Sequence, residues 1–208
     1  MSATSRYEVL IAGAGPAGIA TALHLVRRRP ELAGRIGVIE KGRHPRVKVC
    51  AGGLIPRTLM ALAELGLALE VPAVEVFNVT ARTEAGTVEL GEAREPLCTI
   101  VRRDEFDARL VRGARERGVD IIEQTRVLEA AQDGGGVRLV TDRGVFEAAV
   151  LVGADGSGSR VRSSVFGRNK RNVGRAIMAD VPVEAERTRE FAERRYRFDF
   201  TCVGAGIR

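Results

Sequence analysis

The sequence predicts an α/β fold in which a parallel sheet carries an antiparallel meander and is interrupted by a second, smaller sheet. Three observations support this prediction. Residues 7–29 join an apolar strand-like run, a glycine-rich turn and a helical pattern. A second apolar run over residues 35–42 follows that helix, which is the order of a unit with two parallel strands. Within residues 119–156, three strand-like runs are separated by short polar turns, which is typical of a meander.

The opening unit has a local signal at each of its boundaries. The strand over residues 7–15 is a short apolar run that ends in glycine, as in buried strands of parallel sheets. Pro16 suits the first turn of a helix, where no N–H is needed, and the helix is predicted to end at Arg29 because Pro30 follows. The second strand ends at Glu40, where a long, basic, glycine-rich loop replaces the next expected helix.

The middle of the chain predicts a second sheet between two helices. The first helix lies near Pro56–Leu65. The sheet is predicted from three alternating runs, at residues 73–81, 86–92 and 97–103. Residues 103–118 then have the apolar spacing of an amphipathic helix that ends at a glycine.

The last third of the chain predicts mostly strands. The meander consists of three runs, at residues 119–130, 135–142 and 144–156. A short helix is expected within residues 158–165. Two further strand-like runs follow, at residues 175–186 and 195–206.

The composition indicates a globular chain in a reducing compartment. Of the 208 residues 45% are hydrophobic, and no apolar run has the length of a membrane span or of a secretory signal. Cys50, Cys98 and Cys202 are odd in number and widely spaced, which argues against a disulfide framework. With His24 and His44 as the only histidines and no C-x-x-C motif, we expect no metal site. A cytoplasmic protein is predicted.

The net charge of +6 lies in the C-terminal part, because residues 156–208 contain 12 basic and 6 acidic side chains. Basic character of this kind can attract phosphate, anionic lipid or nucleic acid. Aromatic residues make up only 4% of the chain, so base-stacking surfaces are scarce and we expect no nucleic-acid binding. Two hypotheses remain for the basic part: peripheral contact with a membrane, or an ordinary solvated surface.

A nucleotide-binding motif lies between the first strand and the first helix. Gly13, Gly15 and Gly18 form G-x-G-x-x-G, in which the glycines permit a tight turn, approach of a pyrophosphate to the backbone, and close packing of helix on strand. The helix N-terminus adds N–H donors and a partial positive charge. Glu40 lies 22 residues after Gly18, where an acid accepts hydrogen bonds from ribose hydroxyls and disfavours a 2′-phosphate. These residues, with the adjoining Lys41, predict a Rossmann-like site for an adenine dinucleotide; the alternative is that Glu40 is a solvated strand-end residue.

A second strand-to-glycine turn favours FAD over a nicotinamide cofactor. The apolar residues 149–152 lead into Gly153, Asp155 and Gly156 and then into a helix. Such a late glycine turn with an acid, together with the interrupted order after Glu40, points to FAD. Asp155 has a second hypothesis, in which it caps the following helix; both roles are compatible.

Four stretches carry a family resemblance, in this order: GAGPAG, PRVKVCAGGL, RRDEFDARL and GADGSGSRVR. With them the chain resembles the geranylgeranyl reductase family of FAD-dependent oxidoreductases, which are relatives of flavin-dependent aromatic hydroxylases. The stretch CAGGL after its PRVKV lead-in is the most specific part of the likeness. AIMADVPVE is similar to the strand that opens the substrate-binding sheet of those enzymes.

The resemblance implies a role for several residues. Ala17 is expected at the adenosine and pyrophosphate site with Glu40. The other implied cofactor contacts are Cys50, Ala51 and Gly53 near the flavin, Arg103 at the phosphate or ribityl group, Val127 at the adenine, and Asp155 and Gly156 beside the cofactor. Three of these residues have structural alternatives: Arg103 can pair with Asp107 one helical turn away, Cys50 can be a small buried hydrophobe, and Val127 can be an ordinary strand residue.

The resemblance also predicts a domain organisation. Residues 1–70 and 98–170 are expected to form a Rossmann-like FAD-binding domain, and residues 71–97 and 171–208 the start of a truncated substrate-binding sheet. The family's second Gly-Asp motif is missing after Asp155, and so is its tryptophan-containing aromatic motif. We therefore expect the sequence to be the N-terminal part of a longer protein.

The function that this resemblance implies is reduction of isoprenoid double bonds, as in geranylgeranyl groups, of a small-molecule or prenyl-lipid substrate. NAD(P)H or ferredoxin would be the reductant, and no catalytic residue stands out. One alternative is an FAD- and NAD(P)H-dependent aromatic monooxygenase or halogenase. Another is a nucleotide-binding remnant without activity.

Overall fold

The computed structural model describes residues 5–91, 94–167 and 177–201. The chain forms two compact units: the first unit comprises Met1–Lys48 and Asp104–Arg175, and the second comprises Val49–Arg103 and Ala176–Arg208. The predicted domain boundaries lie elsewhere, because they group residues 49–70 and 98–103 with the cofactor-binding part. How each segment contributes to function stays a prediction.

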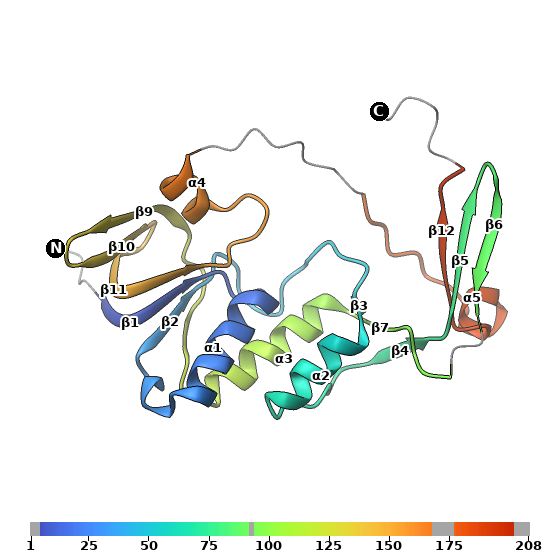
Figure 1. The fold of residues 1–208 in the computed structure, drawn as a ribbon, viewed down its shortest axis with the longest axis horizontal. Coiled ribbons are helices and arrows are strands. Elements are labelled where there is room, and N and C mark those ends of the chain that lie inside the picture. The colour runs from blue at the N-terminus through green and yellow to red at the C-terminus, as the bar shows by residue number, and fades with distance from the viewer. Residues whose placement is uncertain (1–4, 92–93, 168–176, 202–208) are drawn as a thin grey trace. The chain divides into compact units, whose positions relative to one another are not determined.

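The first unit is built on one six-stranded sheet with the strand order β8-β2-β1-β11-β10-β9 (Figure 1). The strands are β1 (Ser5–Ala12), β2 (Ile36–Ile39), β8 (Asp120–Ile122), β9 (Val127–Asp133), β10 (Gly136–Thr141) and β11 (Gly144–Gly153). Strands β8, β2, β1 and β11 are parallel, and β11, β10 and β9 form an antiparallel meander. The predicted α/β fold with its attached meander is confirmed.

The C-terminal half of β1 and the whole of β2 are buried on both faces of this sheet. Leu10 and Ile11, neighbours in β1, are both fully buried and point to opposite faces. Leu10 belongs to the cluster that includes Leu139 and Val161 of α4 (Arg160–Phe166). Ile11 lies on the other face, against α1 (Pro16–Arg28), where a side chain at Gly18 would touch it. Double-sided burial explains why these strands appear in the sequence as continuous apolar runs.

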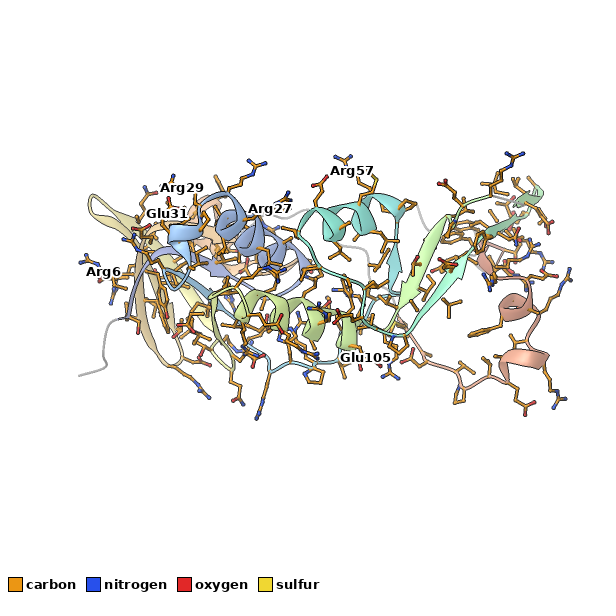
Figure 2. The ribbon with its side chains drawn as sticks, turned by 90° about the horizontal axis from the view of Figure 1, so that it is seen from below. Arg6, Arg27, Arg29, Glu31, Arg57 and Glu105 are labelled. Carbon is orange, nitrogen blue, oxygen red and sulfur yellow. The ribbon has the colours of Figure 1, made fainter. Side chains whose placement is uncertain are left out.

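Helix α1 follows its sequence signals closely. Pro16 is its first residue, and the apolar face that it turns to the sheet includes Ile19 and Leu23. Its last turn contains Arg27, whose positive charge is favourable at a helix C-terminus. Just beyond it, Arg29 contacts Glu31 in the short 3-10 helix Pro30–Leu32 (Figure 2). The predicted stop before proline is therefore observed.

Two predicted strands are each divided into two. Residues 119–130 form β8 and β9, because the chain turns between them at Gln124, whose φ is +56°. Residues 73–81 form β4 (Ala73–Val76) and the start of β5 (Asn78–Thr83), which belong to different sheets. The first break falls in the polar run at residues 123–126, whereas apolar residues continue through the second break, so there the sequence pattern contains no sign of the change of partner.

The second unit contains two three-stranded sheets. One has the order β3-β7-β4, with β3 (Gly53–Leu54) and β7 (Cys98–Val101). The other has the order β12-β5-β6, with β6 (Gly86–Leu90) and β12 (Arg195–Asp199). Its helices are α2 (Pro56–Glu64) and α5 (Arg189–Ala192), with a 3-10 turn at Ala185–Arg187. Helix α3 (Arg103–Arg115) begins at the last residue before the chain returns to the first unit.

The strand expected at residues 175–186 is wrong for the part that the structure describes. Residues 177–184 form no strand and pair with none of the described strands. Pro182 lacks the N–H that a ladder needs, and an extended segment without a neighbour is not a strand. The run at 195–206 forms β12 only over its first five residues. Phe200 and Thr201 follow outside the strand, and the part from Cys202 onward lies outside the described residues.

The β12-β5-β6 sheet has two chemically different faces. Tyr196, Val79 and Leu90 are in register across it, as are Phe198, Ala81 and Val88. Because side chains alternate along a strand, these residues share one apolar face. Leu90 is 64% exposed and Phe198 is 44% exposed. Arg195 lies on the opposite face, where it donates to Thr80 and pairs with Glu89.

Candidate cofactor site

The first glycine of the motif joins two turns that are far apart in sequence. Gly13 has φ +103°, a conformation that side chains disfavour. A Cβ atom there would lie 2.4 Å from the carbonyl oxygen of Ala154 and 3.0 Å from the Cα of Asp155. The backbone N–H of Ala154 donates to Ala12 over 2.8 Å. The two predicted glycine turns are therefore side by side at the ends of β1 and β11.

The other two glycines have separate physical reasons. A Cβ at Gly18 would lie 1.9 Å from the carbonyl oxygen of Gly13, so only glycine lets α1 approach the turn. Gly15 has an ordinary φ of −75°, and the nearest atom to a Cβ there is Nη2 of Arg46, at 3.8 Å. Gly15 is the N-cap of α1 and no side chain caps the helix. The N-terminus of α1 thus presents bare backbone, with exposed Ala17 in its first turn.

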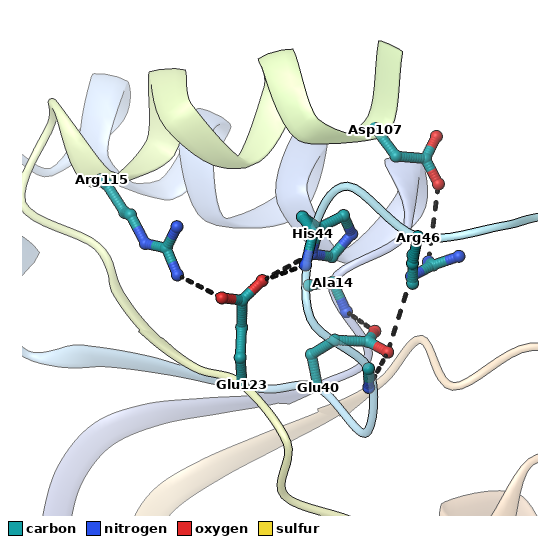
Figure 3. Close-up of polar contacts among 8 residues, drawn as sticks. Ala14, Glu40, His44, Arg46, Asp107, Arg115 and Glu123 are labelled. Carbon is teal, nitrogen blue, oxygen red and sulfur yellow. Dashed lines mark hydrogen bonds and ion pairs between the residues drawn. The ribbon is translucent and has the colours of Figure 1, made fainter. Parts of the chain in front are cut away.

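Glu40 lies against this turn. One carboxylate oxygen accepts the backbone N–H of Ala14 over 2.9 Å, and the other accepts that of Gly42 over 2.8 Å (Figure 3). The residue is only 4% exposed, so the alternative of a solvated strand-end glutamate is wrong. Lys41, the next residue, is exposed. The carboxylate keeps further lone pairs, which is the chemistry that a ribose diol needs.

Asp155 caps the beginning of α4. Its Oδ2 atom accepts the backbone N–H of Arg160 over 2.6 Å and that of Val161 over 3.2 Å, as the capping hypothesis predicts. Its Oδ1 atom is buried without a hydrogen-bond partner among the described residues. Gly156 has φ +84°, and nothing lies within 4 Å of a Cβ there. Val127 begins β9, opposite Thr141. The cofactor roles of these residues stay predictions.

Arg46 is a residue of this site that the sequence analysis did not assign a role. Its Nε atom lies 3.6 Å from Oε1 of Glu40, and its Nη2 atom lies 3.5 Å from Oδ2 of Asp107 on α3 (Figure 3). The side chain is 19% exposed, whereas the Asp107 side chain is fully buried. Arg46 belongs to the PRVKVC stretch, so the signal was its position between the acid of the motif and the CAGGL loop.

The base of the same loop is fixed by a partly buried cluster of hydrogen bonds around Glu123. Both the backbone N–H and the Nδ1 atom of His44 contact Oε1 of Glu123, at 2.7 and 2.8 Å, and Arg115 donates to Oε2 over 2.9 Å. Burial raises the pKa of Glu123, but the hydrogen bonds from His44 and Arg115 and the charge of Arg115 outweigh it. The pKa of Glu123 is therefore below its ordinary value, and the carboxylate is stabilised.

Four of the predicted cofactor residues belong to the second unit. Cys50, Ala51 and Gly53 are exposed, so the alternative of Cys50 as a small buried hydrophobe is wrong. Arg103 opens α3 directly after β7. Gly52, which the sequence did not single out, has φ +77°, and a Cβ there would lie 1.9 Å from the carbonyl oxygen of Val101. It brings the CAGGL loop against β7. A contribution of these residues to cofactor binding stays a prediction.

The residues present in the first unit fit the diphosphate and ribose of FAD. The α1 N-terminus is uncapped, Gly15 keeps its surface free of a side chain, and Glu40 lies beside the turn. The Nε atom of Arg46 is buried without a hydrogen-bond partner within the described ranges. An anion at this turn would meet backbone N–H donors and a cation.

Searched over the described residues, the chain has no group of three metal-binding side chains and no helix able to span a membrane.

The comparison with known families agrees with this geometry. The family described as FAD binding domain matches residues 6–203. The chain belongs to this family, whose range covers nearly the whole sequence. The narrower resemblance to geranylgeranyl reductases stays a prediction, because the similar proteins also include aromatic hydroxylases.

Similar proteins carry out different reactions. Menaquinone reductase from Mycolicibacterium smegmatis is 30% identical over 172 residues, which cover 79% of this chain and 41% of that protein. 3-Hydroxybenzoate 6-hydroxylase from Polaromonas naphthalenivorans is 29% identical over 184 residues, covering 81% and 44%. A geranylgeranyl bacteriochlorophyll reductase-like structure from Thermoplasma acidophilum has a TM-score of 0.57 at 21% identity, covering 72% of this chain and 38% of that one, and shows the fold alone. The chain spans about half the length of the curated relatives it matches.

Proposed function

We propose that the protein is an FAD-dependent oxidoreductase whose first unit holds the diphosphate at the N-terminus of α1 and the adenosine ribose at Glu40. One observation carries the proposal: the Glu40 carboxylate accepts the N–H of Ala14 inside the glycine turn, at 2.9 Å. This contact fixes an acid beside bare backbone, so a sugar hydroxyl and a phosphate of one ligand can be bound together. Membership of the FAD binding domain family supports FAD as that ligand.

The remaining cofactor contacts are proposed on the same basis. In the first unit, Val127, Asp155 and Gly156 would lie along the adenosine and the linker, because the turn at Asp155 adjoins Gly13. In the second unit, Cys50, Ala51, Gly53 and Arg103 would lie at the flavin end. Bound FAD supplies the redox chemistry, with NAD(P)H or ferredoxin as the reductant. The protein's own residues bind and orient it, and none of them is assigned a proton-transfer role.

For the reaction, we propose reduction of an isoprenoid double bond of the geranylgeranyl type. The similarity to a menaquinone reductase supports reductive chemistry on a substrate with an apolar part. The second unit also has apolar surfaces of suitable size. A cavity of about 700 Å³ is lined mainly by aliphatic side chains of α2 and β4, among them Leu59, Leu62 and Val74. The apolar face of the β12-β5-β6 sheet adds further surface of this type.

Aromatic hydroxylation or halogenation is a second candidate of equal standing. The 29% identity to 3-hydroxybenzoate 6-hydroxylase favours it, since that enzyme acts on an aromatic acid. Oxygen uptake separates the two candidates. A monooxygenase consumes oxygen when NAD(P)H and an aromatic substrate are added together, whereas a prenyl reductase proceeds under anaerobic conditions with a reductant alone.

A prenyl-lipid substrate would place the protein in the cytoplasm with peripheral contact to a membrane, and we propose this location. The arginines of the described C-terminal segment, residues 177–201, do not favour this contact. All five arginines between residues 187 and 197 pair with a carboxylate: Arg187 with Glu184, Arg189 with Glu193, Arg194 with Glu75, Arg195 with Glu193 and Glu89, and Arg197 with Glu190. Their charge is locally compensated, which favours the solvated surface for this segment. The apolar sheet face is the better candidate for lipid contact.

Titration of the purified chain with FAD tests the proposed function. Gly15→Val is the informative variant, because the backbone at Gly15 accepts any residue and the nearest atom to the new Cβ is 3.8 Å away. We expect the variant to keep its melting temperature and to lose FAD binding by at least about tenfold, since the side chain enters the path of the phosphate. Gly158→Val, at a position with open space, is the matched control. A wild-type chain that is folded and binds no FAD would instead support the remnant without activity.

A further inference from the structure

Arg46 lies over the place where the proposed diphosphate would be bound. Its Nη2 atom is the nearest group to a Cβ built at Gly15, at 3.8 Å. A Cβ at Gly42 would lie 3.0 Å from the Cδ of Arg46, so the aliphatic part of the arginine rests on the loop backbone there. The residue comes from the loop after β2, and β2 and β11 flank β1 on opposite sides. Figure 3 shows Arg46 between Glu40 and Asp107.

The guanidinium is located by charge but poorly satisfied by hydrogen bonds. Its two ion pairs, to Glu40 at 3.6 Å and to Asp107 at 3.5 Å, are longer than the 2.7–2.9 Å usual for a charged hydrogen bond. The Nε atom is buried and has no hydrogen-bond partner among the described residues. Burying an arginine donor without an acceptor is unfavourable. A phosphate oxygen at the α1 N-terminus would supply the missing acceptor.

The two carboxylates that face Arg46, those of Glu40 and Asp107, have different roles. Glu40 is already fixed by the N–H groups of Ala14 and Gly42, so its position does not depend on Arg46. Asp107 is fully buried on α3 and faces the outer nitrogen of the guanidinium. Through this ion pair Asp107 can orient the arginine fork.

We propose that Arg46 is a diphosphate ligand of this site and that Asp107 is the positioning residue that orients it. The inference rests on the proposed function and deepens it. Helix-end N–H groups and the glycine turn contact one side of the anion, and Arg46 contacts the other. Recognition by Arg46 distinguishes nucleotides that contain a diphosphate from the nucleoside alone, because adenosine has no phosphate oxygen to accept a charged hydrogen bond from the guanidinium.

Titrations with adenosine and with ADP test this proposal directly. We expect Arg46→Gln to weaken ADP binding by about tenfold or more and to leave adenosine binding within about twofold, since one charged contact is lost. Arg46→Lys keeps the charge but not the fork, and its ADP affinity should be intermediate. Arg43→Gln, which removes an exposed arginine from the same loop, is the matched control and should change neither affinity.

The positioning role has its own readout. Asp107→Asn should lower the preference for ADP over adenosine, and the double variant with Arg46→Gln should lower it no further than Arg46→Gln alone. This ratio is measured on folded protein, so a loss of stability in Asp107→Asn does not obscure it. Equal losses for adenosine and ADP in Arg46→Gln, or no loss for either, would overturn the proposal. A wild-type chain that binds neither ADP nor FAD would overturn the proposed function itself.

Discussion

The two units of the chain are stabilised in different ways. In the first unit, Leu10 and Ile11 of one strand are fully buried on opposite faces of the sheet, and the turns at its end fit so closely that Gly13 and Gly18 have no room for a side chain. In the second unit, small sheets leave large apolar residues at the surface, such as Leu90 at 64% exposure. In the first unit, close backbone contacts therefore fix the geometry of the glycine turns. The second unit instead leaves apolar surfaces exposed and available to a partner.

The largest effect is expected where backbone contacts are closest. Gly18→Ala places a Cβ 1.9 Å from the carbonyl oxygen of Gly13, so either α1 or the turn has to move. We expect a loss of about 4 kcal/mol in the free energy of unfolding, measured by urea denaturation. Gly158→Ala, which meets nothing within 4 Å, should change it by less than about 0.5 kcal/mol. Similar values for the two variants would show that close packing does not define the turn.

The next effect tests double-sided burial. Leu10→Ala removes a fully buried side chain from the cluster beneath α4, and we expect a loss of about 3 kcal/mol. Thermal and urea unfolding followed by circular dichroism measure it. A loss below about 1 kcal/mol would mean that this face of the sheet is less well packed than the first unit requires.

A smaller, pH-dependent effect is expected at the loop base. Glu123→Gln removes the negative charge of the carboxylate that accepts hydrogen bonds from His44 and Arg115. We expect the free energy of unfolding at pH 7 to fall by about 1–2 kcal/mol. The folded pKa of Glu123 is below its unfolded value, so its contribution is complete above pH 4.5 and is lost as the pH falls through the folded pKa. The difference in melting temperature between wild type and variant should therefore shrink below pH 4.5. A difference that stays constant from pH 7 to pH 3 would contradict this assignment.

The smallest effect is expected on the exposed apolar face of the second unit. Leu90→Thr exchanges an exposed leucine for a residue that favours strands, and the free energy of unfolding should change by less than about 0.5 kcal/mol. The same measurement as for Leu10→Ala makes the two units directly comparable. A loss of about 2 kcal/mol would show that this face is covered in solution, which would remove the contrast between the units.

The sequence predicted most where function depends on local backbone geometry. The strand, glycine turn and helix from residue 7 to residue 29 were found because glycine and proline have specific conformational uses there. The partnership of Glu40 with the turn followed from its spacing, its acidic side chain and its place at the end of the second strand. These features are encoded within short stretches, and the structure places them as predicted.

The sequence predicted least where a residue's role depends on a distant neighbour. Arg46 is one arginine among thirty, and only Asp107 and Glu40, brought together by α3 and β2, distinguish it. The break at Phe77 between β4 and β5 is similar, because the flanking apolar pattern continues while the pairing partner changes. Such roles are properties of the tertiary arrangement, and a periodic pattern contains no information about them.

The contact between Gly13 and Ala154 has a consequence for the order of events during synthesis. Strand β1 pairs with β11, and Ala12 lies opposite Gly153, so the residues between these strands must be translated before the first turn can meet its neighbour. Pairings over such a sequence separation are slow steps of folding, because a long loop must close first. The glycine turn at Gly13 therefore gains its contact with Ala154 only after β11 has been translated and has paired with β1.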